Sequence, residues 1–273
     1  MALVFERENE KIVHAHVEGV PVSPDRDFDD WEVGFLRVQH GELHREAHVS
    51  FSVENVSLDY TFQATTPAFC YLDNRDGCPT FLADNRFEQS GRVSGVLTVG
   101  DRVIPFDTTA HRDHSWGTRD WTAIHHYRWI NIQGDGIAIN FMHLDAIDQP
   151  TLHGYVDLNG EQAGIVGARF KIDRDSDLFV YTSADLEIED ELGRTTVVRS
   201  GPRDVAITWP AGGLASHDAA SYCTVNGQRA LMHVEEGWPP AFVRHRRAMA
   251  HADEDTAEAR AALQVNRAVG VKD

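Results

Sequence analysis

The chain has few cysteines and no long apolar run. Its 273 residues include only three cysteines, and none of them forms a paired Cys-x-x-Cys spacing. An odd, small number of isolated cysteines is typical of a reducing compartment. No apolar run approaches the length of a membrane-spanning helix, and no charged-then-apolar leader opens the sequence. We therefore expect a cytoplasmic protein without a membrane-inserted segment.

Basic residues are scarce relative to acidic ones. The sequence holds 25 Lys and Arg against 43 Asp and Glu, which leaves a formal net charge of −18 at pH 7. Such a surface repels nucleic-acid phosphates and anionic lipid. Nucleic-acid binding is therefore disfavoured, and an uncharged or apolar small molecule is a more compatible partner.

The signatures of several enzyme classes are missing. There is no Gly-x-Ser-x-Gly elbow, no Walker loop and no Gly-x-Gly-x-x-Gly run, so hydrolase, NTPase and dehydrogenase functions lack support. The 15 histidines raise the question of a metal, for which His111, Asp113 and His143 would supply two imidazoles and a carboxylate. Because the familiar metal-binding spacings do not occur in their usual settings, we predict no metal site.

Short strands make up most of what the sequence does contain. Segments rich in Val, Phe, Tyr and Thr show period-two patterning, with turn residues at the breaks. Hairpins are predicted for residues 92–106, 126–144, 152–172, 179–207 and 220–235, and single strands for residues 32–38 and 80–83. Helical patterning appears only at residues 242–265. The sequence therefore predicts an all-β protein of barrels or sandwiches with a C-terminal helix.

Chain length and strand pattern favour two domains. A chain of 273 residues corresponds to one large or two ordinary domains, and we prefer two. With the boundary near Trp121, the N-terminal β domain covers residues 1–122, the C-terminal β domain residues 123–242 and a helical tail residues 243–273. Ligand sites commonly form at such junctions.

The stretch at residues 109–121 is the most unusual part of the chain. It contains two carboxylates, two imidazoles, two guanidiniums and two indoles. In an extended strand, one face would carry His111, Asp113 and Ser115, and the other would carry Arg112, His114 and Trp116. Gly117 indicates a backbone that bends closely past a neighbour. The stretch is a candidate pocket wall; the alternative is a structural latch in which Arg–Asp and His–Asp pairs satisfy one another.

Acid–base catalysis in an aromatic pocket is the chemistry that these residues favour. Desolvation beside indoles disfavours the charged form of a carboxyl such as Asp113, which would then donate a proton near neutral pH. Arg112 or Arg119 nearby would act in the opposite direction. Positive charge that develops on a hydrocarbon, during alkene protonation or loss of water, would be stabilised by aromatic faces, for which the candidates are Trp116, Trp121, Tyr127 and Trp129. Ordinary core packing is the alternative role for each ring.

The run His111-Arg112-Asp113-His114-Ser115-Trp116-Gly117, followed by Trp129-Ile130-Asn131-Ile132-Gln133, resembles the lipocalin-like carotenoid 1,2-hydratase superfamily. With residues 87–93 before it, the Arg-Asp-His-Ser-Trp-Gly core is similar to a bacterial branch of that superfamily. The resemblance implies two lipocalin-like (calycin) β domains packed together, a cavity for an apolar terpenoid or polycyclic substrate, and no organic cofactor. It also implies functional roles for His114 or His111, for Trp116, and for Asp145 after His143.

Our first hypothesis is a cofactor-independent acid–base lyase or isomerase that adds, removes or relocates water or a double bond on a hydrophobic substrate bound in a β-barrel pocket. Asp113 would be the acid, with His114 or His111 as its proton partner and Glu88 as a second acid or base. Substrate-orienting and pocket-lining roles are expected for Arg112, Arg119, Trp116, Trp121, Tyr127, Trp129, His143 and Asp145. A non-catalytic carrier of an apolar molecule and a cyclase that acts by shape alone stay open, as does a homodimer.

Overall fold

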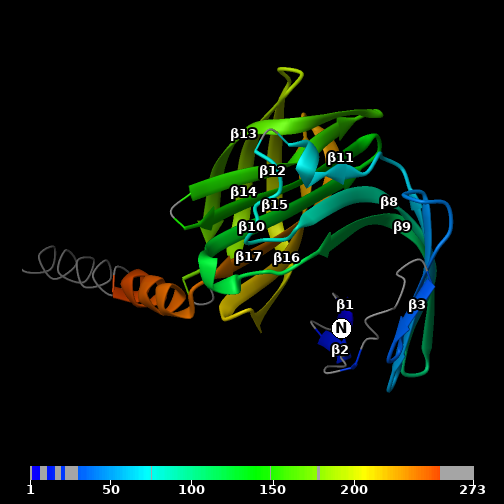
Figure 1. Cartoon of the computed structure of the whole chain (residues 1–273). Helices are drawn as coiled ribbons and strands as arrows, with labels where there is room; N and C mark the ends of the chain where they lie inside the picture. The colour runs from blue at the N-terminus through cyan, green and yellow to red at the C-terminus, as the bar shows by residue number, and fades with distance from the viewer. Residues whose placement is uncertain are drawn as a thin grey trace, which may run out of the picture.

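The computed structural model describes residues 2–6, 11–15, 20–21, 30–74, 76–147, 149–176 and 179–252. Strands make up most of these residues, so the all-β prediction is confirmed. Figure 1 shows two strand-rich parts, a barrel and a curved sheet, with a helix at residues 240–252 leaving the barrel.

The second half of the chain forms a closed barrel of eight antiparallel strands. Each strand pairs with the next along the chain, and the last pairs with the first, Trp129 lying opposite Glu235. The strands are β10 (Ile124–Gly134), β11 (Ile137–Ala146), β12 (Gln149–Leu158), β13 (Glu161–Arg174), β14 (Tyr181–Asp190), β15 (Thr195–Ala211), β16 (Leu214–Val225) and β17 (Gln228–Trp238). Full closure leaves no free sheet edge.

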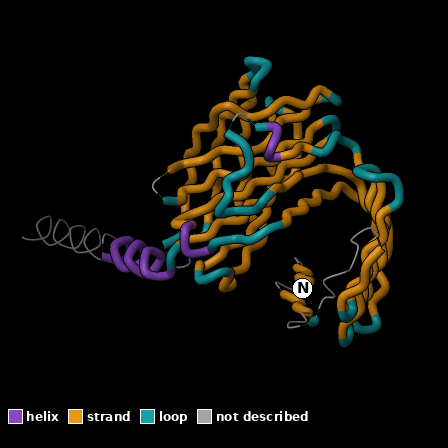
Figure 2. Tube along the Cα trace, viewed as in Figure 1, coloured by secondary structure: helices purple, strands orange, loops and turns teal. Residues whose placement is uncertain are grey.

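The first half contributes a seven-stranded sheet, in which no pairing between described residues closes a barrel. Its strands are β3 (Asp30–Val33), β4 (Leu36–His40), β5 (Glu46–Val53), β6 (Val56–Ala64), β7 (Phe69–Cys70), β8 (Asn85–Val99) and β9 (Arg102–Trp116). A separate hairpin consists of β1 (Ala2–Glu6) and β2 (Lys11–Ala15). Figure 2 shows how β8 and β9 run from the barrel into this curved sheet.

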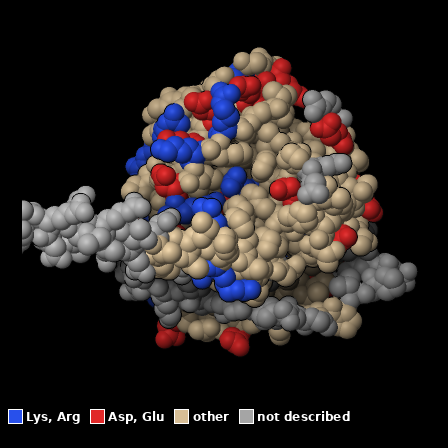
Figure 3. Space-filling view, turned by 90° about the vertical axis from the view of Figure 1, so that its left-hand side faces the viewer, with Lys and Arg blue, Asp and Glu red and all other residues tan. Residues whose placement is uncertain are grey.

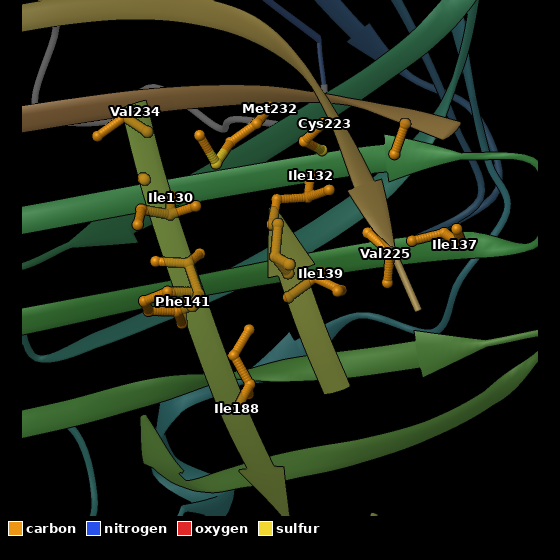
Figure 4. Packing of buried hydrophobic residues seen from close by; sticks show 14 of the residues in the cluster. Ile130, Ile132, Ile137, Ile139, Phe141, Ile188, Cys223, Val225, Met232 and Val234 are labelled. Atoms are coloured by element: carbon orange, nitrogen blue, oxygen red, sulfur yellow. The ribbon is translucent and has the colours of Figure 1, made fainter. Parts of the chain in front are cut away.

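The barrel interior is filled by apolar side chains. Ile130 and Ile132 on β10 are fully buried, and they belong to a cluster that draws on all eight barrel strands, including Phe141, Leu186 and Val198. Figure 4 shows these side chains meeting between the strands. Because side chains alternate along a strand, the odd-numbered Tyr127 and Trp129 of β10 lie on the outer face of the barrel, toward β8 and β9.

Three strand and helix predictions differ from the structure. Residues 32–38 are two strands, because a turn with Gly34 at φ 59° separates β3 from β4. Residues 80–83 form a turn rather than a strand, held by hydrogen bonds from the amides of Leu82 and Ala83 to the Pro79 carbonyl. The predicted helix at residues 242–265 begins at residue 240, and the part beyond residue 252 lies outside the described residues. No helix among the described residues has the length and apolarity needed to cross a bilayer.

The surface charge is not spread evenly. Figure 3 shows Lys and Arg gathered in a band across the face seen from the left of Figure 1, with Asp and Glu above, beside and below it. The formal net charge of −18 therefore coexists with locally basic surface.

Candidate functional site

The unusual stretch forms the end of β9 and has the predicted alternation. β9 pairs with β8 along its full length, which places His111 opposite Ser90 and Asp113 opposite Glu88. The side chains of His111, Asp113 and Ser115 contact partners on the barrel side of β9, whereas those of Arg112, His114 and Trp116 contact the opposite side. The strand ends at Gly117, where φ is 101° and an added Cβ would lie 2.4 Å from the carboxyl carbon of Asp84. The predicted close approach at Gly117 is confirmed.

Glu88 is the centre of a buried polar cluster on the barrel side. Its carboxylate is fully buried and accepts hydrogen bonds from Arg86 Nε at 2.6 Å, Trp129 Nε1 at 3.1 Å and the Tyr71 hydroxyl at 3.3 Å. His111 Nε2 lies 2.7 Å from the other carboxylate oxygen. Burial raises the pKa of Glu88, but the Arg86 guanidinium and the His111 hydrogen bond outweigh burial and hold that pKa below its usual range. Glu88 is therefore an ionised, fully bonded anchor.

Asp113 is ion-paired rather than isolated beside indoles. Its Oδ2 atom lies 2.8 Å from Nη2 of Arg86, the guanidinium that also binds Glu88. The Asp113 side chain is 43% exposed, whereas that of Arg86 is 6% exposed. Arg86 thus links the buried Glu88 carboxylate to one that reaches solvent.

A cavity of about 170 Å³ lies between this face of β8 and β9 and the outer face of the barrel. It is half open, and its walls combine apolar and aromatic side chains with a few charged ones. They are Leu82, Arg86, Asp113, Arg119, Trp121, Ile124, Tyr127, Trp129, Met142, Leu144 and Glu235. A cleft whose apolar walls surround a few convergent polar groups is the usual form of a small-molecule site; this cavity is smaller than most, and its exposed lining is about equally polar and apolar.

Glu235 is the carboxyl of this cavity whose charged form is disfavoured. Burial raises the pKa of Glu235 and the Asp218 carboxylate adds to that rise, against the opposing effects of the Tyr127 hydrogen bond, His233 and Arg86. The Tyr127 hydroxyl donates to Glu235 Oε1 at 2.5 Å and lies 3.1 Å from Ser216 Oγ. Burial also raises the pKa of Tyr127, which therefore stays a phenol. The raised pKa makes the protonated form of Glu235 more accessible than that of an ordinary glutamate.

Gly237 allows this arrangement. It lies opposite Tyr127 in the pairing of β10 and β17. A Cβ at Gly237 would lie 2.0 Å from Cε1 of the Tyr127 ring, closer than atoms can approach. The missing side chain gives the ring room to lie against β17, with its hydroxyl at Glu235.

Arg119 and Trp129 complete the walls. Arg119 donates to the Leu82 carbonyl and to Ser115 Oγ, both at 3.1 Å, and its guanidinium lies over the Trp121 ring. Within the described ranges no carboxylate lies at ion-pair distance from Arg119. The Trp129 indole meets His111 and His233 edge-on, with ring centroids 5.5 and 5.6 Å away. The cavity therefore offers one cation without an acidic partner and one fixed aromatic face.

The structure separates the residues predicted from the sequence into groups. Those that line the cavity are Asp113, Arg119, Trp121, Tyr127 and Trp129, while Glu88 and His111 lie behind Trp129. Arg112, His114 and Trp116 lie on the other face of β9. His143 packs against Phe170 and His126 and, like Asp145, is not part of this wall. This cavity lies outside the barrel wall, at the junction where the sequence analysis expected a ligand site, and a substrate pocket inside a barrel stays a prediction.

The metal combination considered from the sequence does not converge. His111 and Asp113 share one face of β9, but His143 belongs to β11, where it lies opposite Arg128. In the described part of the chain, no group of three or more His, Cys, Asp or Glu side chains is arranged to hold a metal ion.

Two charged residues of the cavity were missed by the sequence analysis. Arg86 and Glu235 were not singled out, although each had a visible signal. Arg86, Glu88 and Ser90 recur at every second position of a strand, and so share a face. Glu235 and Glu236 are adjacent acids within an otherwise largely apolar strand, so one of them must face each side of the barrel wall.

Comparisons with known proteins agree on the fold. Kievitone hydratase from Nectria haematococca superposes with a TM-score of 0.54 at 13% identity, covering 86% of this chain and 78% of that one. CghA in complex with Sch210972 gives a TM-score of 0.56 at 12% identity, covering 77% and 69% of the two chains. These neighbours are consistent with the lipocalin-like fold that the motif implies, and its bacterial branch stays a prediction.

Comparison at the sequence level gives a family but no activity. No curated protein matches this chain. A family model described as a domain of unknown function (DUF7064) matches residues 1–240.

Proposed function

Since the chain belongs to the DUF7064 family, a domain of unknown function, we propose its activity from its cavity: a cofactor-independent acid–base lyase, isomerase or cyclase that acts on an apolar substrate. A neighbour named as a hydratase has the same fold, so the fold is compatible with the addition of water. The terpenoid or polycyclic class of substrate rests on the motif resemblance.

The raised pKa of Glu235 on the cavity wall is the observation that carries the proposal. Two carboxyls lie on either side of Trp129, and their surroundings drive their pKa values apart, up for Glu235 and down for Glu88. Separation of this kind assigns acid and base roles in active sites. Glu235 is the neutral proton donor, and Glu88 is the charged anchor that fixes Arg86, His111 and Trp129.

Asp113 takes the role of base in this proposal rather than the acid role that the sequence favoured. Arg86 holds one of its oxygens at 2.8 Å, and its partial exposure on the cavity wall leaves the other oxygen available to a substrate. A carboxylate beside the substrate is suited to remove a proton from carbon.

Loss of water from an alcohol illustrates the use of these groups. Glu235 transfers its proton to the hydroxyl, the carbon–oxygen bond breaks and water leaves, and the Trp129 face stabilises the carbocation. Asp113 then takes the proton from the neighbouring carbon, and the carbon–hydrogen electron pair forms the double bond. Proton exchange with water restores both carboxyls. Hydration is the reverse sequence, and Arg119 orients a substrate oxygen in either direction.

Isotope incorporation tests the proposal. Terpenoid and polycyclic tertiary alcohols, with the corresponding alkenes, are incubated with the protein in D₂O or H₂¹⁸O and analysed by mass spectrometry. Wild type is expected to exchange oxygen or deuterium on at least one compound, and Glu235→Gln to lower that rate about a hundredfold or more. Glu187→Gln, at an exposed pair with Arg169 on β14, is the matched control and keeps the wild-type rate. Binding of a compound without exchange on any member of the panel would instead favour a carrier.

A further inference from the structure

The cavity described above uses only one face of β9. The opposite face lines two hollows of the curved sheet: Arg112 and His114 border both, and Trp116 borders only the smaller one. The larger hollow has a volume of about 390 Å³, within the range of small-molecule sites. Its walls are largely apolar and include Val38, Val49, Tyr60, Phe62, Phe87 and Val93. The smaller hollow, of about 190 Å³, adjoins it at Phe87 and Arg112.

Arg112 places a positive charge in this apolar hollow. Its guanidinium lies 4.6 Å from the centre of the Phe62 ring and 5.6 Å from that of Phe87. Its Nε and Nη2 atoms donate to Gln89 Oε1 at 3.0 and 2.7 Å. No carboxylate of the described residues comes within ion-pair distance of it. Partial burial lowers the pKa of Arg112, which reflects the cost of a charge without a counter-charge.

Gln89 holds the Arg112 guanidinium in place without supplying a negative charge. Its side chain is 1% exposed, and its Nε2 atom donates to the carbonyls of His44 and Thr66, both at 2.8 Å. These two bonds fix the amide so that its oxygen faces Arg112. A neutral oxygen thus orients the guanidinium without cancelling its charge, and the remaining N–H groups stay available for an anion.

We propose that this hollow binds an apolar carboxylate of the fatty-acid type. The ligand carboxylate pairs with Arg112, and its hydrocarbon chain lies along Val38, Val49 and Val93. The Tyr60 hydroxyl is a second donor on the same wall, because burial raises the pKa of Tyr60 against the opposing effect of Arg112. Guanidinium–carboxylate bonds are among the strongest in proteins, and the apolar walls exclude competing water. The Arg112 side chain lies on the face of β9 opposite to the proposed acid–base groups, although His111 and Asp113 also border this hollow.

Calorimetric titration with decanoate and with 1-decanol tests the assignment, because the two probes differ in their charged head group. Wild type is expected to bind decanoate about tenfold or more tightly than decanol. Arg112→Gln removes the charge and keeps a donor for Gln89, and it is expected to lose this preference while decanol binding is unchanged. Arg112→Lys keeps the charge and retains part of the preference. Arg92→Met, at an exposed pair with Asp107 on the same sheet, is the matched control.

A variant that keeps Arg112 allows the proposal to be tested even if the Arg112 variants misfold. Val49→Trp fills the hollow and is expected to abolish binding of both probes, with the fold checked by circular dichroism. The proposal is overturned if wild type binds no decanoate, if it does not prefer decanoate to decanol, or if the Arg112→Gln and Val49→Trp proteins bind decanoate as wild type does.

Discussion

Glu235 and Glu236 are neighbours on β17, and their carboxyls lie on opposite sides of the barrel wall. Glu236 is buried inside the barrel end, where Arg128 Nε donates to it at 2.7 Å and Arg174 donates twice at 2.6 Å. Burial raises the pKa of Glu236, but the two guanidiniums outweigh burial and lower it to about 2. Among the described residues Glu235 has no such ion pair, and its pKa is raised. One glutamate is structural, and the other is the candidate proton donor.

Glu235 makes wild-type stability fall as the pH rises. Above the ordinary glutamate value of 4.5 the unfolded chain releases this proton while the folded chain retains it, so folding is penalised until the raised pKa is passed. Glu235→Gln has no proton to release. The melting temperature of Glu235→Gln minus that of wild type is therefore expected to increase as the pH is raised from about 4 to about 8. A difference that does not change with pH in paired thermal melts would show that the Glu235 pKa is not raised.

Glu236→Gln is expected to destabilise the barrel strongly. The substitution leaves the guanidiniums of Arg128 and Arg174 buried without a counter-charge, at a cost of about 3–5 kcal/mol in the free energy of unfolding. Urea unfolding measures this cost. The comparison is Glu187→Gln, whose exposed pair with Arg169 should change stability by less than about 1 kcal/mol. Equal effects of the two substitutions would contradict a structural role for Glu236.

His126 makes the barrel sensitive to acid. Burial and the nearby Arg128 lower the pKa of His126 from 6.5 to about 3, so its contribution to stability is complete above pH 6.5 and declines as the pH falls toward 3. The loss within that window is about 1.4 kcal/mol per pH unit for this one group. Its ring stacks on Trp238 and its Nε2 atom has no hydrogen-bond partner among the described residues, so His126→Phe retains the main contact.

Unfolding of His126→Phe at several pH values measures this effect. The variant should lose less stability than wild type between about pH 6.5 and about pH 4.5. His125→Phe, at the exposed neighbouring position, is the control and should retain the wild-type slope. If both variants retain it, the acid sensitivity comes from other groups.

Gly237→Ala is expected to displace the Tyr127 ring. The new Cβ would lie 2.0 Å from Tyr127 Cε1, and relief of the overlap should cost about 1–3 kcal/mol of stability and weaken the hydrogen bond to Glu235. In a Tyr127→Ala background the same substitution should cost much less, and urea unfolding of the four proteins gives this coupling. Gly167→Ala, where the nearest atom is 3.7 Å away, is the neutral control. Additive effects would mean that the Tyr127 ring does not limit residue 237.

Local patterns account for the parts of the fold that the sequence predicts. Period-two hairpins locate the strands of the barrel, and the alternation of residues 111–116 follows from their being extended. The errors occur where a turn is made by residues that also suit a strand. At residues 32–38, a single glycine at positive φ is sufficient to divide the segment, because Gly34 carries no Cβ.

The assembly of the site depends on pairings between distant strands. The bond from Tyr127 to Glu235 joins residues 108 positions apart and forms because β10 and β17 close the barrel. Trp129 meets Glu88 only because β8 and β9 lie against the outside of that barrel. The local sequence of residues 85–90 shows that Arg86 and Glu88 share a face but not what that face meets, which is why Arg86 and its ion pair with Asp113 were not predicted.

The alternation of β9 constrains how this part of the chain can change. A deletion of one residue directly before His111 would shift residues 111–116 by one position and exchange the two sets of side chains, placing Arg112 and His114 toward the barrel and Asp113 toward the curved sheet. Both hollows would lose their chemistry in a single event, whereas a substitution on one face leaves the other intact. Substitutions can therefore change either hollow without affecting the other. Insertions or deletions cannot, because both hollows depend on the same register of β9.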